Sequence, residues 1–250
     1  MEVQEHGEQW EEVGGELEFR HTMVILRKGD IYFHARYNNR MLPPSQVEPR
    51  LLEMCRIPSE HLWPVHSSDL TLAPVPSPVD SYIKRPRMIQ YVQDHARRIP
   101  DLFLAEARIC EILKKHPHPN IAQYFGCLTR HGRITGLCLR KYHITLEDRL
   151  KSDRPVPRDI LKGIQEGLHH LHNLGLIHND VNPSNIMFKA NDDTPVIIDF
   201  DSCGREGDKL VKVGTLGWSD DSFDFATPRN DYYGLQKIHD AIELQAGRHV

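Results

Sequence analysis

The chain of 250 residues is about 39% hydrophobic and 26% charged, and 31 Lys and Arg against 35 Asp and Glu give a formal net charge of -4. These values are typical of a globular chain with its own core and exclude a mainly disordered one. Without a basic excess we expect no nucleic-acid partner. No apolar run is long enough to span a membrane, and residues 1–19 hold seven Glu and no Lys or Arg, unlike a signal peptide. We therefore expect a soluble protein of the cytoplasm, with the nucleus left open and no membrane partner.

The first third of the chain carries few regular patterns. Carboxylates dominate residues 1–19, which we expect to form an acidic, flexible tail. A hairpin pattern follows, with an apolar run at Thr22–Leu26, turn-forming residues at 28–30 and alternation over Ile31–Tyr37. The prolines that recur from Trp63 to Val79 then favour loops over strands in that stretch. Ser81–Lys84 is predicted to be the next strand.

Helical periodicity governs most of the remaining chain. Asp101 is placed as the N-cap of a helix that runs to about Lys115. Apolar spacing predicts a second helix over Pro157–Asn173. Two short strands and a last helix are expected at Ile186–Phe188, Val196–Ile198 and Asp231–Gln245.

The residues that suggest chemistry lie in the polar segment His178–Asn185, which is followed by Asp199-Phe200-Asp201. The segment reads H-x-D-x-x-x-x-N and the second motif reads D-F-x, with short apolar strands on both sides. This pattern resembles the catalytic loop and metal-binding motif of the protein kinase superfamily. The alternative interpretation is a turn rich in Asn and Asp that only caps loops.

Phosphoryl transfer to an alcohol needs one carboxylate near the attacking hydroxyl. It also needs a second carboxylate and an amide oxygen to hold Mg²⁺ against the phosphates. The resemblance places Asp180 as the catalytic residue, and Asn185 and Asp199 as the Mg²⁺ ligands. It makes His178 a buried structural histidine of the same loop.

Further motifs upstream match the same family. Lys84 stands where the family has its ATP-binding lysine on a strand, and Glu106 is placed as its partner on the next helix, with Glu111 on a different face of that helix. His118–Ile121 resembles the H-P-N-I turn after this helix, with an extra His-Pro pair inserted. The strand that leads into the adenine-reading hinge supplies Leu139 as gatekeeper, Lys141 and Tyr142.

Downstream, Thr215 occupies the position of an activation-segment Thr whose hydroxyl braces the catalytic Asp. Asp231 matches the buried Asp of helix F that ties down the catalytic loop. The resemblance implies an α+β, two-lobed protein kinase-like fold, with a small antiparallel-sheet lobe and a mainly helical lobe that stops after helix F. The expected parts are a tail at residues 1–19, an enlarged N-lobe ending in the hinge at 20–142, and a short C-lobe at 143–250.

The sequence also departs from the family pattern. No glycine occurs from Ser67 to Ser81, where the family has a Gly-rich loop over the phosphates. Asn182 replaces a Lys that contacts the γ-phosphate, Asn179 replaces an Arg, and Asp201 replaces the Gly of D-F-G. Without the Gly-rich loop we expect unusual nucleotide affinity, and Asn182 in place of Lys should weaken charge stabilisation in the transition state. Asn179 in place of Arg removes the usual partner of a phosphorylated activation loop.

Three functions follow from the resemblance. The first is an ATP- and Mg²⁺-dependent kinase that phosphorylates Ser or Thr of a protein substrate. The second is a small-molecule phosphotransferase, similar to aminoglycoside or choline kinases, whose acceptor is a small alcohol. The third is a pseudokinase that serves as a binding module.

Overall fold

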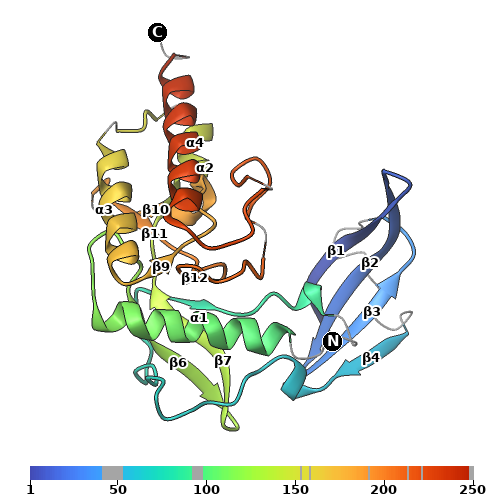
Figure 1. The fold of residues 1–250 in the computed structure, drawn as a ribbon. Coiled ribbons are helices and arrows are strands. Elements are labelled where there is room, and N and C mark those ends of the chain that lie inside the picture. Colours follow the sequence, from blue (N-terminus) through green and yellow to red (C-terminus); the bar gives the residue numbers. More distant parts are fainter. Residues whose placement is uncertain are drawn as a thin grey trace. The chain divides into compact units, whose positions relative to one another are not determined.

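In the computed structural model, the residues described are 1–40, 53–91, 98–152, 154–157, 159–190, 192–212, 214–220 and 222–247. The chain forms two compact units (Figure 1). Unit 1 comprises Met1–Ser67, Arg85–Leu104 and Thr129–Gly136, and unit 2 comprises Ser68–Lys84, Ala105–Leu128 and Leu137–Val250. This division differs from the expected boundary at residue 142, so the assignment of lobes to 20–142 and 143–250 stays a prediction.

Unit 1 is built on a four-stranded antiparallel sheet in the order β1-β2-β3-β4. Its strands are β1 (Glu2–Val13), β2 (Glu16–Lys28), β3 (Ile31–Tyr37) and β4 (Met54–Ile57). The hairpin predicted over residues 22–37 is confirmed, since β2 and β3 pair from Lys28↔Ile31 to Thr22↔Tyr37. The described residues of this unit also include the short 3₁₀ helices η3 (Ser59–His61) and η4 (Met88–Gln90).

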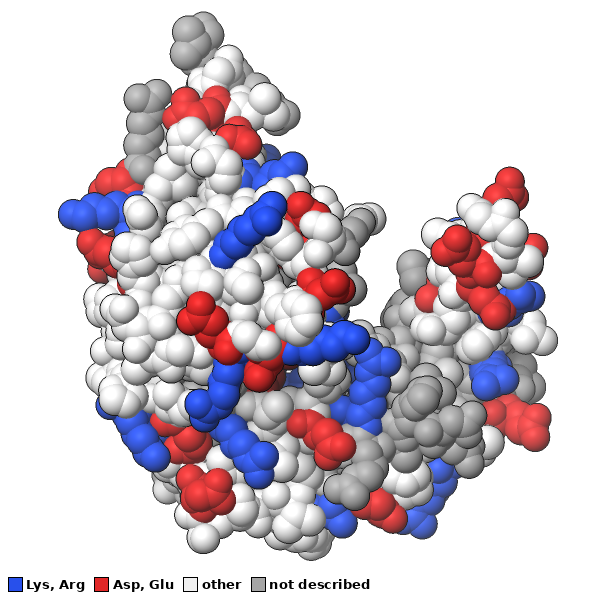
Figure 2. Space-filling model, viewed as in Figure 1, with Lys and Arg blue, Asp and Glu red and all other residues white. Residues whose placement is uncertain are grey.

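Residues 1–19 are not a flexible tail in this structure, because they form β1 and the start of β2. Gly14 and Gly15 have φ of 63° and 89° and close the two-residue turn between these strands. A Gly-Gly pair suits such a hairpin, since its backbone reaches positive φ without a steric penalty. The prediction weighed the charge of this segment and missed the turn. Most of its carboxylates are exposed, and Figure 2 shows acidic side chains on the β1–β2 ribbon, but Glu5 is half-buried and accepts from the N–H groups of Met88 and Ile89.

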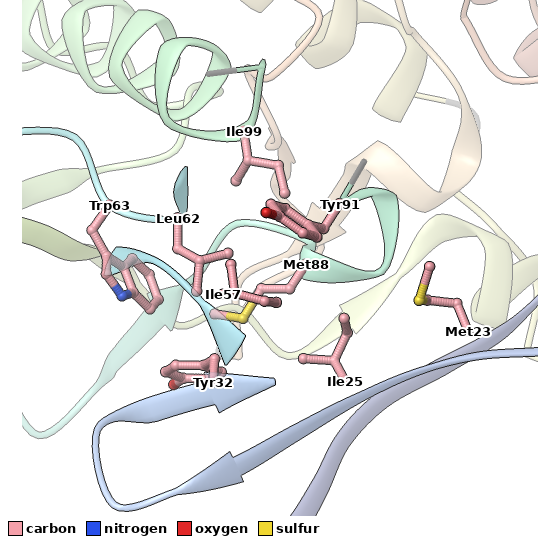
Figure 3. Close-up of a cluster of buried hydrophobic side chains, with 9 residues drawn as sticks. All are labelled: Met23, Ile25, Tyr32, Ile57, Leu62, Trp63, Met88, Tyr91 and Ile99. Atoms are coloured by element: carbon pink, nitrogen blue, oxygen red, sulfur yellow. The ribbon is translucent and has the colours of Figure 1, made fainter. Parts of the chain in front are cut away.

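The sheet of unit 1 buries apolar side chains on both faces because successive residues of β2 point to opposite sides. Met23 and Ile25 belong to the cluster drawn in Figure 3, whereas Val24 and Leu26 belong to a second cluster with Ala35. This explains why the run at residues 22–26 is continuously apolar rather than alternating. The first cluster consists of Met23, Ile25, Tyr32, Ile57, Leu62, Trp63, Met88, Tyr91 and Ile99.

Unit 2 holds short sheets and most of the helices; the first turns of the helix Arg98–Lys115 belong to unit 1. Three strands pair in the order β5-β7-β6, three in the order β11-β10-β8, and β12 pairs with β9. Their bounds are β5 Ser81–Lys84, β6 Tyr124–Arg130, β7 Arg133–Arg140, β8 Ile144–Thr145, β9 Leu176–Ile177, β10 Ile186–Phe188, β11 Pro195–Ile197 and β12 Gly204–Arg205. Strands β6 and β7 also contribute residues to unit 1.

Within the described residues, the α-helices are α1 (Arg98–Lys115), α2 (Leu146–Lys151), α3 (Ile160–Asn173) and α4 (Pro228–Gly247). The helices predicted from Asp101, over Pro157–Asn173 and from Asp231 are confirmed, although α1 already includes Arg98 and α4 begins three residues before Asp231. Antiparallel sheets together with these helices confirm the expected α+β class. Within the described residues, no helix combines the length and the apolar character needed to cross a bilayer.

Helix α3 approaches strand β11 closely, and two glycines allow this contact. A Cβ on Gly163 would lie 2.7 Å from Cγ of Pro195, and one on Gly167 would lie 2.9 Å from Cδ1 of Ile197. Ile164, Leu168 and other apolar residues of α3 are fully buried. This packing fixes β11, which leads directly into Asp199.

Candidate active site

The predicted lysine and two predicted carboxylates meet within unit 2. Lys84, at the end of β5, donates from Nζ to Oε1 of Glu106 on α1 at 2.5 Å and to Oδ1 of Asp199 at 2.6 Å. The side chain of Glu106 is 3% exposed, that of Lys84 18% and that of Asp199 29%. One cation is therefore shared by two carboxylates, and the open side of the cluster is at Asp199.

Burial and charge oppose each other in this cluster. Burial alone would lower the pKa of Lys84, but the adjacent Glu106 and Asp199 outweigh it and raise the pKa. Burial would raise the pKa of Asp199, whereas Lys84 and the backbone N–H of Asp201 lower it below its ordinary value. Lys84 is therefore a cation and Asp199 an anion at neutral pH. Burial raises the pKa of Glu106, although Lys84 opposes that shift.

Beside this cluster lies a cavity of about 400 Å³. Lys84 and Asp199 line one part of it, and the three predicted hinge residues Leu139, Lys141 and Tyr142 line another. The remaining lining residues are Tyr82, Ala122, Arg140, Met187 and Ile198. The structure thus brings all the predicted nucleotide-binding residues except Glu106 to one cavity, and Glu106 contacts it through Lys84.

Asp180 lies in a dense hydrogen-bond network. Its Oδ1 accepts from the backbone N–H of Thr215 at 2.8 Å and from Nδ2 of Asn182 at 3.0 Å. Its Oδ2 accepts from Nδ2 of Asn185 at 3.1 Å. Three donors therefore orient the carboxylate. The N–H of Ile198 donates to the carbonyl of Asn185 at 2.9 Å, which links this loop to the residue before Asp199.

Asp231, in the first turn of α4, binds the backbone of the same loop from the protein interior. It is fully buried and accepts from the backbone N–H groups of His178 and Asn179, at 2.9 and 2.8 Å. His172 contributes Nε2 at 2.8 Å to the same carboxylate. Asp231 thus occupies the position that the sequence predicted for it.

His178 is buried between the loop and the strand that precedes Asp199. Its Nε2 bonds to the carbonyl of Ile198 at 3.0 Å, and the N–H of Asp180 donates to its Nδ1 at 3.3 Å. In this arrangement Nε2 donates to the carbonyl and Nδ1 accepts from the backbone N–H. The predicted structural place of His178 matches these contacts.

Two residues of the site have a left-handed backbone. Asn179 has φ of 63° and Asp199 has φ of 62°. Asn and Asp tolerate this region better than other non-glycine residues. Asn179 also donates from Nδ2 to the carbonyls of Ile177 and Ser202, and accepts from Asn230 at 3.0 Å. It therefore joins the loop to α4 in place of the Arg expected there.

One detail differs from the expectations: the backbone N–H of Thr215 contacts Asp180, whereas its hydroxyl accepts from Nδ2 of Asn182 at 3.2 Å. Glu111 lies on a different face of α1 from Glu106, as expected, and accepts from the N–H and hydroxyl of Thr71 at 2.7 and 2.9 Å. Asp201, in place of the Gly of D-F-G, accepts from Nζ of Lys212 at 2.7 Å.

The donor set around Asp199 and Asn185 suits Mg²⁺, which favours one or two carboxylate oxygens together with phosphate oxygens. Oδ1 of Asp199 is engaged by Lys84 and Asp201, whereas Oδ2 accepts no hydrogen bond from the described residues. Asn185 uses its amide nitrogen for Asp180, which leaves its side-chain oxygen as the available ligand.

Sequence reasoning missed several residues of the site. Tyr82 was recognised only as part of the strand, yet it lies two positions before Lys84 and so faces the same side and lines the cavity. His172 and Asn230 support Asp231 and Asn179, and no local sequence signal indicates either contact. Tyr82 could have been found from strand alternation alone.

The chain is similar to known protein kinases. The model of the protein kinase domain matches residues 89–219, just over half of the chain. The serine/threonine-protein kinase/endoribonuclease IRE2 of Homo sapiens is 31% identical over 40% of this chain and 12% of that protein. The mitogen-activated protein kinase kinase kinase bck1 of Aspergillus fumigatus is 28% identical over 41% of this chain and 7% of its own length. The dual specificity testis-specific protein kinase 1 of Homo sapiens is 29% identical over 44% of this chain and 20% of that protein.

The chain therefore spans only a small part of these curated relatives. The family match includes Glu106, Asp180, Asn185 and Asp199. Lys84 lies before the matched segment and Asp231 after it, so geometry alone places those two residues at the site.

Proposed function

This chain belongs to the protein kinase family, and from that premise we propose that it transfers the γ-phosphoryl group of ATP, with Mg²⁺, to Ser or Thr of a protein. The observation that carries the proposal is the contact of Lys84 with both Glu106 and Asp199 beside a cavity lined by the hinge residues. ATP and a cytoplasmic protein substrate are the partners in this proposal.

The cavity suits the base and sugar of a nucleotide. Its volume of about 400 Å³ lies in the range of small-molecule sites, and its walls are mainly apolar. Lys84 supplies a fixed positive charge at one end, where it would bind phosphate oxygens. Glu106 keeps this side chain in place, because the two carboxylates hold Nζ from two sides.

The acceptor hydroxyl would lie at Asp180. The carboxylate is oriented by three donors, and in this role it receives the proton of the attacking hydroxyl. Asn185 and Asp199 would hold Mg²⁺, which neutralises phosphate charge when bound. Asp231 and His178 keep the loop in position and contact no substrate in this proposal.

A small alcohol is the second candidate acceptor, and Asn182 favours it. The side chain of Asn182 is 3% exposed, and its amide is used by Asp180, Thr215 and the N–H of Ser184. It therefore offers no cation to the γ-phosphate, as in the small-molecule kinases that the sequence resembles. The same experiment separates the two acceptors.

The test is transfer of labelled γ-phosphate from Mg-ATP to generic protein substrates and to a set of alcohol metabolites. Asp180→Asn should lower transfer by roughly 10²–10⁴-fold, the usual scale for a general base. Asp240→Asn, at an exposed carboxylate of α4, is the matched control and should leave transfer unchanged.

Label on protein that depends on Asp180 would support the proposal, whereas label only on a small alcohol would favour the second candidate. Absence of both label and ADP release would contradict both and would favour a pseudokinase. Equal activity of the wild type and Asp180→Asn would refute the assignment of Asp180.

A further inference from the structure

A second cavity in unit 2, of about 740 Å³, lies at the C-terminal end of α1 and along β6. Lys114, Arg140 and Lys189 line it, and no Asp or Glu is among its described lining residues. The proposed kinase reaction makes no use of this cavity. It is larger than the nucleotide cavity, and its volume lies in the range of sites for small organic molecules.

The positive charge of this cavity is not neutralised from within. Among the described residues, Lys114, Arg140 and Lys189 make no ion pair. The Nζ of Lys114 donates to the carbonyl of Phe125 at 2.8 Å, and Arg140 contacts Oε1 of Gln123 at 3.5 Å. The carboxylates that act on its surroundings lie outside the lining: Glu166 acts on His118, Glu111 on Tyr124, and Asp192 interacts with Lys189. A concave surface with cations of one sign attracts an anion.

A third cavity, of about 290 Å³, differs from the second in the charges that line it. It is also lined by cations, including Lys189, but Asp192 and Asp193 line it too. Arg149 pairs with Asp193 there at 2.9 Å. Two carboxylates thus offset part of the charge of three cations in this smaller cavity, whereas no carboxylate is among the described lining residues of the larger one.

One wall of the larger cavity is the turn that carries the extra His-Pro pair. Pro117, His118 and Pro119 line the cavity. The ring of His118 stacks on His170 at 4.7 Å, and Nε2 of His170 bonds to the carbonyl of His116 at 2.7 Å. Burial, followed by the neighbouring His170, lowers the pKa of His118, so this wall is neutral near pH 7. The contacts of His170 with His116 and His118 therefore hold this part of the lining, which carries no charged side chain.

We propose that this cavity binds a small organic phosphate monoester whose body is flat and apolar, such as an aryl phosphate. The phosphate pairs with Lys114, Arg140 and Lys189, because a dianion matches several cations better than a carboxylate does. The body packs against Phe125 and the two prolines of the wall. A volume of about 740 Å³ suits a small molecule of this kind.

The proposal does not depend on the kinase reaction, but the two cavities share Ala122, Arg140 and Tyr142 as lining residues. A probe could therefore enter the wrong one. Lys114 and Lys189 line only the second cavity of this pair, whereas Lys141 lines only the nucleotide cavity. Lys115 follows Lys114 on α1, is exposed and lines neither.

The test is calorimetric titration of the whole chain with phenyl phosphate, and separately with phenol and with inorganic phosphate. We expect saturable binding of phenyl phosphate, weaker binding of both fragments, and a loss of at least about 10-fold in affinity for the double variant Lys114→Gln/Lys189→Gln. Lys115→Gln and Lys141→Gln should bind as the wild type does. Unchanged far-UV circular dichroism would verify that the double variant is folded.

Three results would overturn the proposal. The first is no saturable binding of phenyl phosphate to the wild type. The second is an equal loss in Lys115→Gln, which would indicate diffuse attraction to surface charge. The third is a loss in Lys141→Gln without one in the double variant, which would place the probe in the nucleotide cavity.

Discussion

The sheet of unit 1 and the active site of unit 2 are assembled from contacts of different range. In unit 1, β1, β2 and β3 follow one another through two tight turns, and each pairs with its neighbour in sequence. In unit 2, Lys84 meets Asp199, 115 positions later in the chain, and Asp231 binds residues 52 and 53 positions before it. Local sequence patterns are therefore enough to predict the pairing of these strands, but they do not predict the long-range contacts of the active site.

The two regions also differ in where their carboxylates lie. Most carboxylates of the β1–β2 ribbon are exposed or half-buried, and the pair between Arg20 and Glu11 lies at the surface. At the site, Glu106 and Asp231 are almost completely buried and each accepts from fixed donors. Buried donors that lose their acceptor cost far more than exposed ones. Single polar substitutions should therefore matter much more at the site than in the ribbon.

The largest effect is expected for Asp231→Ala. The substitution leaves the N–H groups of His178 and Asn179 and the ring of His172 without their acceptor. We expect a loss of about 4 kcal/mol in the free energy of unfolding, measured by urea denaturation. Glu11→Ala, at the surface pair, is the matched change in unit 1 and should cost less than about 1 kcal/mol. Similar losses for both would contradict the comparison.

The second-largest loss in the free energy of unfolding is expected for Lys84→Met, because this substitution leaves Glu106 buried without its cation. Breaking such a pair costs about 3 kcal/mol, and Mg-ATP affinity should fall with it. The control is Lys162→Met on α3, where Lys162 and Glu166 lie 3.8 Å apart at the surface, and its effect should stay below about 0.5 kcal/mol. Thermal unfolding measures both, and a small effect of Lys84→Met would show that Glu106 is solvated.

A smaller effect is expected in unit 1 for Gly15→Ala. The residue has φ of 89°, a conformation that a Cβ penalises, and no atom within 4 Å would meet that Cβ. The cost is therefore conformational, about 1 kcal/mol. Gly15→Asn should cost less, since Asn tolerates positive φ. Faster hydrogen exchange in β1 would report the change, and unaltered exchange would mean that the turn does not hold the ribbon.

The smallest effect concerns pH. Burial, with a further contribution from Arg36, lowers the pKa of His21 and of His34 in unit 1. Burial and His170 do the same for His118 in unit 2. The unfolded chain then binds these protons more readily, so stability is complete above about pH 6.5 and falls as the pH drops below it.

Hydrogen exchange between pH 7 and pH 5 checks this expectation in each unit. Peptides from β2 and β3 should lose protection on acidification, and His34→Gln should reduce that loss. His118→Gln should act only on peptides of unit 2. A pH dependence that neither substitution alters would assign it to other groups.

Much of the fold could be predicted because its signals are local. Apolar periodicity predicted α1, α3 and α4, and turn chemistry predicted the β2–β3 hairpin. The β1–β2 hairpin was missed although Gly14-Gly15 is an equally local signal, because the charge of the segment was given more weight. The helix starts differ by about three residues, since terminal turns depend on tertiary contacts.

For the site, residue types and spacing were sufficient to place Asp180, Asn185, Asp199, Lys84 and Glu106. The spacing did not indicate that Thr215 contacts Asp180 through its backbone, or that Asn182 joins the two. It did not indicate that His172 completes the environment of Asp231 either. These contacts depend on how separate elements approach one another.

By itself, the amino-acid sequence determined the kinase family, the α+β class and the identity of the chemical groups, because motif order and periodicity are properties of the chain. Only the tertiary structure decided that Lys84 binds Asp199 as well as Glu106, since Asp199 lies 115 positions after it in the chain. It alone revealed the cation-lined cavity behind the inserted His-Pro pair. Cavities and buried ion pairs arise where distant segments pack, and no local pattern encodes that packing.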